Sequence, residues 1–170
     1  MVDAKEALVA MRSFLLCFLT IVLSESCLIA LDFNSTKNRR VMVVAGAGGE
    51  EEYTSLFSEW AGALTNTFQA NAAELVKINN NPDNTDARKI IESKLKQWVA
   101  AKDDEIWILL VGHGTFDGKQ AKFNLVGNDV SDLDFQSWLK PHQGPLVFIN
   151  TSSSSAPFIR TLSGPNRVIA

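Results

Sequence analysis

The sequence predicts an α/β fold, a three-layer sandwich in which a mostly parallel sheet is covered by helices on both faces. Two observations indicate this. Apolar runs of strand length alternate with segments of helical spacing, and alternation of that kind places successive strands in parallel. The runs Val41 to Ala45 and Ile106 to Val111 are apolar throughout, as expected for strands that are buried on both faces.

Each predicted helix and strand rests on its apolar spacing and on the residues at its ends. In the segment from Glu50 to Gln69, apolar residues recur three and four apart behind three glutamates, whose charge suits a helix N-terminus. Glycines follow the strands that end at Ala45 and Val111. In chain order we expect strand 41–45, helix 50–69, strand 75–78, a polar loop 79–84 with the cap of the next helix, helix 85–101, strand 105–111, a small hairpin 119–126, helix 132–140, strand 145–149, helix 156–162 and a strand from 167.

The N-terminal segment resembles a signal peptide. The apolar run from Phe14 to Leu23 follows an arginine and has about half of the ~20 residues that a membrane-spanning helix needs. Ser24 and Ser26 supply the small side chains that cleavage before Cys27 requires. We therefore expect a leader at 1–27, whose true start could be Met11, a polar spacer at 28–40 and an exported α/β domain at 41–170 with no stable membrane span after cleavage.

Two other interpretations of this segment are weaker. The Ser-Glu-Ser before Cys27 does not match the lipobox of a lipoprotein, so a lipid anchor is not expected. A buried core helix is disfavoured by the arginine before the apolar run and by the small residues after it.

Composition excludes several classes of function. With 46% hydrophobic and 21% charged residues the chain is ordinarily globular, and a net charge of −3 without a basic stripe argues against nucleic acid as a partner. Both cysteines, Cys17 and Cys27, lie in the leader, and the only histidines are His113 and His142. The folded domain is therefore expected to hold no disulfide, no metal site and no cofactor.

Three loops follow strand ends and should lie at the same edge of the sheet, where ligands bind in folds of this class: Gly46 to Glu50, Gly112 to Gly118 and Asn150 to Ala156. The first loop fails the dinucleotide fingerprint, because Glu51 stands at the third glycine position and neighbouring glutamates would repel a pyrophosphate. A tight strand-to-helix turn is the simpler interpretation, and small-ligand or nucleotide binding remains an alternative.

The other two loops carry the residues that could perform catalysis. His113 follows a buried strand and stands between two glycines, so it could act as a base, and the amide of Gly114 could donate to an oxyanion. The hydroxyls of Thr151 to Ser155 emerge from the next strand, where a nucleophile that faces His113 would stand. A histidine in a glycine turn and serines that cap the next helix are the structural alternatives.

The two motifs together resemble those of the caspase and legumain-like cysteine peptidases. ILLVGHG, from Ile108 to Gly114, is similar to the family's strand that ends in His-Gly, and VFINTSSSS, from Val147 to Ser155, is similar to the strand that runs into its Ala-Cys turn. The resemblance implies a flavodoxin-like winding, with His113 as general base, Gly114 as the oxyanion amide and Ser152 at the nucleophile position. It also implies further chain after residue 170, so the domain looks shortened at its C-terminus and could pair as a homodimer through the sheet edge.

The sequence also departs from the family's pattern. Ser152 replaces the catalytic cysteine, and a serine hydroxyl needs a base in hydrogen-bond contact, whereas a thiol does not. Gly48 stands where legumain-like members have an asparagine that orients the histidine. Asp117 could orient His113 instead, although its glycine-rich loop favours an exposed position.

The sequence therefore favours an exported peptidase-fold domain that is catalytically degenerate and binds a peptide or a protein. The alternative is an active serine-variant endopeptidase with a dyad of His113 and Ser152, and whether the chain is an enzyme stays open. We further expect His142 to be an exposed turn residue and Glu50 to Glu52 to be a helix N-terminal charge cluster, with basic-peptide recognition as its alternative. Four tryptophans are expected in the core: Trp60, Trp98, Trp107 and Trp138.

Overall fold

The computed structural model describes residues 39–83, 86–101 and 104–170. The expected leader, with both cysteines, and all but the last two residues of the expected spacer lie outside these residues. Those two residues, Arg39 and Arg40, already belong to the first strand, where Arg39 pairs with Glu105 and Arg40 with Glu74 of neighbouring strands.

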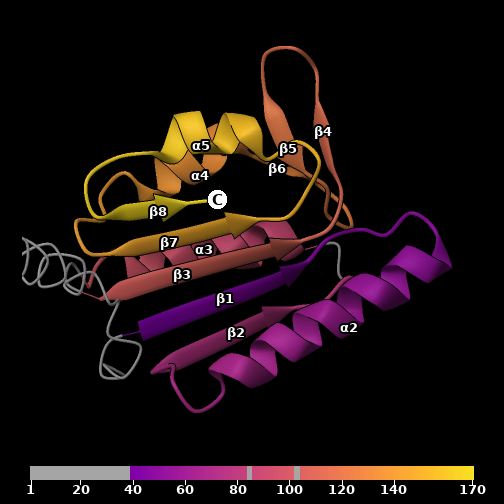
Figure 1. The fold of residues 1–170 in the computed structure, drawn as a ribbon, viewed down its shortest axis with the longest axis horizontal. Helices are drawn as coiled ribbons and strands as arrows, with labels where there is room; N and C mark the ends of the chain where they lie inside the picture. Colours follow the sequence, from indigo (N-terminus) through magenta and orange to yellow (C-terminus); the bar gives the residue numbers. More distant parts are fainter. Residues whose placement is uncertain (1–38, 84–85, 102–103) are drawn as a thin grey trace, which may run out of the picture. The chain divides into compact units, whose positions relative to one another are not determined.

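The described chain alternates strands and helices as the apolar spacing predicts (Figure 1). Most element bounds agree with the expected ones to within two residues, those of the strand at 105–111 and of the last helix coincide with them, and the last strand begins at 167 as expected. The elements are β1 (Arg39–Ala45), α2 (Glu51–Phe68), β2 (Glu74–Ile78), α3 (Ala87–Trp98), β3 (Glu105–Val111), β4 (Gly114–Phe116), β5 (Ala121–Phe123), β6 (Val130–Ser131), α4 (Asp132–Leu139), β7 (Leu146–Asn150), α5 (Ala156–Leu162) and β8 (Arg167–Ile169).

The main sheet has five parallel strands in the order β2-β1-β3-β7-β8. Numbered within this sheet alone, the order is 2-1-3-4-5, which is that of flavodoxin-like doubly wound folds. The predicted α/β sandwich with a parallel sheet is therefore confirmed. The strand order reverses between β1 and β3, and the carboxyl ends of these two strands flank the place where such folds usually bind ligands.

The strands are apolar throughout because both faces of the sheet are covered. In β1, Val41, Val43 and Ala45 pack with buried residues of α2, whereas Met42 and Val44 pack with α3 on the other face. The second face is the larger core, since α4 and α5 also contribute to it. At about 25 cal/mol per Å² of buried apolar surface, this two-sided burial is the main stabilising term of the domain.

A small antiparallel sheet, β4-β5-β6, follows β3 directly. The hairpin was expected over 119–126, and β5 lies there, but its partner β4 begins earlier, at Gly114. The turn explains the shift, because the Asp117 carboxylate accepts hydrogen bonds from the amides of Lys119 and Gln120, and Gly118 has a φ of 90°. The residues after His113 are thus the first strand of a hairpin.

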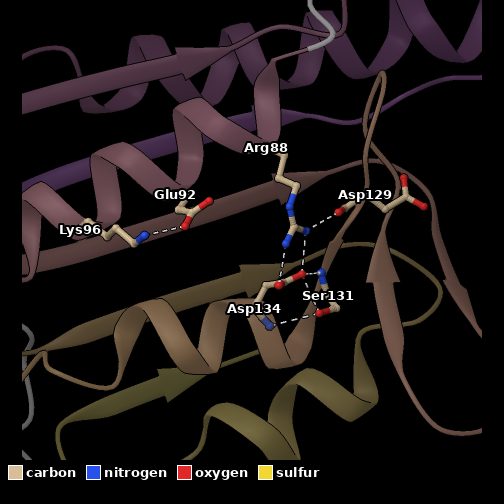
Figure 2. Close-up of polar contacts among 6 residues, drawn as sticks. All are labelled: Arg88, Glu92, Lys96, Asp129, Ser131 and Asp134. Carbon is tan, nitrogen blue, oxygen red and sulfur yellow. Dashed lines mark hydrogen bonds and ion pairs between the residues drawn. The ribbon is translucent and has the colours of Figure 1, made fainter.

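An ion pair joins helices on the larger core (Figure 2). Arg88 of α3 donates two hydrogen bonds of 2.7 Å to the two carboxylate oxygens of Asp134 in α4, and a third of 2.6 Å to the carbonyl of Asp129. Asp134 also completes a capping box with Ser131 at the start of α4. The carboxylate therefore stabilises the helix start and the contact between the two helices.

Two burial predictions are wrong. Trp60 is 49% exposed, because the buried stripe of α2 runs through Phe57, Ala61 and Phe68 and leaves Trp60 at its edge, while the other three tryptophans are in the core as expected. His142 is only 4% exposed, since the chain turns back after α4 and its Nε2 lies 3.2 Å from the carbonyl of Pro145. In the described residues no helix combines the length and the apolar character needed to span a membrane.

Candidate functional site

Ser152 lies just beyond the carboxyl end of β7, in a loop that is tied to the neighbouring strand. The amide and the hydroxyl of Thr151 both donate to the carbonyl of Leu110 in β3, at 3.0 Å each. The amide of Ser152 donates to Oδ1 of Asn150 at 3.0 Å. These bonds fix the loop and turn the side chain of Ser152 inward, where the residue is only 4% exposed.

The side chain of Ser152 packs on the backbone of Gly114. A Cβ atom placed on Gly114 would lie 2.5 Å from Oγ of Ser152 and 2.9 Å from the carbonyl oxygen of Lys122. Only glycine therefore fits at this position without a shift of the backbone. The structure brings together these two residues that the sequence singled out.

Among the described residues, no base is hydrogen-bonded to the hydroxyl of Ser152. Its Oγ is buried and, among the described residues, has no hydrogen-bond partner, so it makes no bond to His113. A serine nucleophile needs its base within about 2.6–3.2 Å to lose its proton. The dyad that the sequence suggested is not formed in this arrangement.

His113 instead belongs to an aromatic cluster. Its ring lies edge-on to those of Tyr53 and Phe57 in α2, with centroid distances of 5.1 Å and 4.9 Å, and the residue is exposed. Its carbonyl accepts a hydrogen bond of 3.0 Å from the amide of Asn124, which begins the pairing of the hairpin. The imidazole is thus held against α2.

The crevice at the strand-order reversal is filled by a side chain of the hairpin. Gly46 follows β1 and Gly112 follows β3, and a Cβ on either one would lie within 3.0 Å of the Phe123 ring. Phe123 is fully buried. The amides of Gly46 and Ala47 donate to carbonyls at 2.9 Å, so neither is free to bind a pyrophosphate. The loop is therefore a tight connection, as its glycines suggest.

Gly48, which stands where an orienting asparagine would be, and Asp117, the candidate to replace that asparagine, both make contacts within their own turns. Gly48 packs on the start of α2, where a Cβ would meet the amide of Thr54. Asp117 is exposed, as expected, and hydrogen bonds from Gln120 and Lys119 to its carboxylate lower its pKa. Both residues serve local turns. In the described part of the chain no three His, Cys, Asp or Glu side chains are grouped so that they could hold a metal ion.

Sequence reasoning missed two features of this edge. Tyr53 and Phe57 are four residues apart on a helix, and that spacing could have indicated a paired aromatic surface. The buried Nδ2 of Asn150, which has no partner among the described residues, lies two residues from the equally unpartnered Ser152 hydroxyl. No sequence signal predicts two orphaned polar atoms, because their state depends on the tertiary packing.

Comparison with known proteins supports the fold and goes no further. No protein-family model matches the chain, and no curated protein is similar to it. The crystal structure of protein GSU0716 from Geobacter sulfurreducens is similar, with a TM-score of 0.53 and 11% sequence identity, over 68% of this chain and 50% of that one. The chain thus spans half the length of that protein, and at this identity the likeness is one of fold.

Proposed function

We propose that this domain is a caspase-like peptidase relative that has lost peptide cleavage and binds a peptide or protein segment over the exposed surface around His113. The observation that carries the proposal is the state of Ser152, whose hydroxyl is buried against Gly114 without a base. A substrate carbonyl would have to reach an oxygen that solvent does not reach. The proposal includes export, which rests on the sequence of residues 1–27.

The aromatic surface beside the strand ends supports binding. Tyr53 is 42% exposed and Trp60 is 49% exposed, and Phe57 joins their rings, with its centroid 5.9 Å from that of Tyr53 and 6.2 Å from that of Trp60. Exposed His113 lies against the rings of Tyr53 and Phe57. Tyrosine and tryptophan are enriched in protein interfaces, where they carry much of the binding energy.

The filled crevice favours a surface site over a deep one. Phe123 occupies the space between the ends of β1 and β3, so a small ligand does not find the cavity that other doubly wound folds offer there. A peptide that lies across α2 and the start of the hairpin needs no such cavity. The charge of the surface is negative, because Glu50, Glu51 and Glu52 are exposed next to Tyr53.

Selection from a displayed library of random peptides on the full chain tests this function. We expect enriched peptides whose affinity falls about tenfold or more with Tyr53→Ala and with Trp60→Ala, as for interface aromatics elsewhere. Leu133→Ala on α4 is the matched control, because Leu133 is 51% exposed and distant in sequence. If no peptide is enriched, or if the control weakens binding as much as the other two variants, the surface around His113 is not the binding site.

A serine peptidase is the second candidate, and one observation favours it. Buried polar atoms without partners are rare in folded proteins, a catalytic role is one of the explanations for them, and Oγ of Ser152 is one such atom among the described residues. The hydroxyl would have to rotate toward His113, and the amide of Gly114 would then be available to an oxyanion. A fluorophosphonate reacts with an activated serine and therefore separates the two candidates.

A further inference from the structure

A pocket lies at the starts of the parallel strands, at the opposite end of the sheet from His113 and Ser152. It has a volume of about 350 Å³ and includes the start of β8, which pairs with the start of β7. Because all strands of the sheet are parallel, these strand starts and the strand ends beside Ser152 lie at opposite edges. The ends of α4 and α5 complete the walls, and the polar residues that line the pocket include Gln136, Lys140, Gln143, Thr161, Asn166 and Arg167.

The pocket carries positive charge without a carboxylate on its wall. Lys140 and Arg167 line it, and no aspartate or glutamate is among the described residues that do. Lys140 is exposed and, in the described part of the chain, makes no ion pair. Asp132 accepts a hydrogen bond from Thr161 but is itself buried behind the wall.

Arg167 differs from the other described arginines that are buried or partly buried. Arg39, Arg40 and Arg88 each pair with a carboxylate, whereas the guanidinium of Arg167 donates only to the carbonyls of Leu162 and Leu139, at 3.1 Å and 3.2 Å. These carbonyls lie at the C-terminal ends of α5 and α4. Because helix C-termini carry partial negative charge, they offset part of the positive charge of the guanidinium. Burial lowers the pKa of Arg167, as expected for a cation that lacks a full counter-charge.

The remaining wall supplies further hydrogen-bonding groups. Gln136 donates through Nε2 to the carbonyl of Thr161, which joins α4 to α5 across the pocket. Gln143 and Asn166 also line it and are exposed. A guanidinium, an ammonium and side-chain amides around one space are the groups that bind phosphate in proteins.

We infer that this pocket binds a phosphate dianion, either as free inorganic phosphate or as the phosphate group of a small phosphomonoester. The dianion would supply the counter-charge that Arg167 lacks and would accept a second contact from Lys140. The volume leaves room for more than the phosphate group itself, since pockets for small organic ligands begin at about 300 Å³. This inference does not depend on the proposed function at the other edge.

NMR titration of the full chain with inorganic phosphate at constant ionic strength tests the inference, and glycerol 3-phosphate is the second arm. We expect saturable shifts confined to the backbone amides of the non-proline residues in 136–143 and 161–167. Tighter binding of glycerol 3-phosphate than of phosphate supports an ester ligand, and equal binding supports the free ion. Shifts that do not saturate, or that spread evenly over basic residues elsewhere, overturn the site.

A matched pair of charge reversals sharpens the test. Lys140→Glu should weaken phosphate binding about tenfold, because it places a negative charge on the wall of the pocket. Lys119→Glu makes the same change of charge on the hairpin turn, where the side chain is exposed, and should leave the affinity unchanged. Equal weakening of phosphate binding by both variants would show that phosphate responds only to the net charge of the protein and would contradict a specific site in this pocket.

Discussion

Gly114 and Ser152 are in contact across the carboxyl edge of the sheet, and each restricts the other. The glycine has no room for a side chain, because the Oγ of Ser152 would be 2.5 Å from a Cβ there. The hydroxyl of Ser152 in turn packs against the backbone of Gly114 and has no hydrogen-bond partner among the described residues. The two residues expected to supply an oxyanion amide and a nucleophile thus pack together in a closed arrangement.

Gly114→Ala should destabilise the fold by about 1–3 kcal/mol, the usual cost of overpacking. The added methyl would meet both Ser152 and the backbone carbonyl of Lys122, which cannot rotate away. Urea denaturation measures the change in the free energy of unfolding. Gly62→Ala is the control, since a Cβ there meets only the end of Lys77 at 3.5 Å and alanine suits a helix better than glycine. Equal stability of Gly114→Ala and the parent chain would contradict the contact.

Ser152→Ala should raise the free energy of unfolding by about 1 kcal/mol. The change removes a buried hydroxyl that makes no hydrogen bond and leaves the Cβ packing in place. Ser153→Ala serves as the control, because that residue is exposed and its hydroxyl makes one long bond of 3.3 Å to the carbonyl of Gly114. A clear loss of stability in Ser152→Ala would mean that its hydroxyl is satisfied in solution.

Phe123→Ala should cost about 3–5 kcal/mol, because it empties the space between the ends of β1 and β3. Phe116→Ala, on the facing strand of the same hairpin, removes a ring that is 51% exposed and should change stability by less than about 0.5 kcal/mol. Chemical denaturation of both variants provides the measurement. Similar effects of the two changes would show that the crevice is not filled as described.

The ion pair of Arg88 and Asp134 should make stability depend on pH at acid values. Burial raises the pKa of Asp134, but hydrogen bonds from Arg88 and Ser131 outweigh it and lower the pKa from 3.8 to about 2. A lowered carboxyl pKa adds stability that is fully present above the unfolded pKa of 3.8 and is lost as pH falls from there through about 2. The partly exposed pair should contribute about 1–2 kcal/mol after solvent screening.

Asp134→Asn should therefore lower the free energy of unfolding at pH 7 and flatten its fall between those two pKa values. Urea denaturation along a pH series gives the comparison. Asp86→Asn is the matched control, because Asp86 pairs with Lys89 in an exposed i,i+3 contact that should add little. An unchanged pH profile in Asp134→Asn would contradict the linkage.

The fold could be predicted because the strands are apolar on both faces and the helices on one. That pattern is local, and it placed β1, β3 and β7 as well as the helices between them. The hairpin was predicted too late in the chain because its first strand begins in the glycine-rich loop. The alternation of apolar and polar residues there is too short to detect. The predicted burial of Trp60 and the predicted exposure of His142 were wrong, because neither residue type indicates on its own whether the side chain will be buried.

The candidate site was predicted in part. The order of strands and loops was enough to place His113 and Ser152 at the same edge of the sheet, since carboxyl ends of parallel strands share an edge. The directions in which the side chains of His113 and Ser152 point could not be predicted from the sequence. They depend on the bonds from Thr151 to Leu110 and on the rings of Tyr53 and Phe57, which are tertiary contacts.

Fluorophosphonate labelling of the purified full chain, read by intact mass, tests most directly whether Ser152 is a nucleophile. The closed contact with Gly114 predicts no adduct on a protein that unfolds cooperatively in urea, while a serine hydrolase in the same reaction is labelled fully. A single adduct that disappears in both Ser152→Ala and His113→Ala, with the fold of both variants intact, would contradict the loss of catalysis and show that His113 activates Ser152.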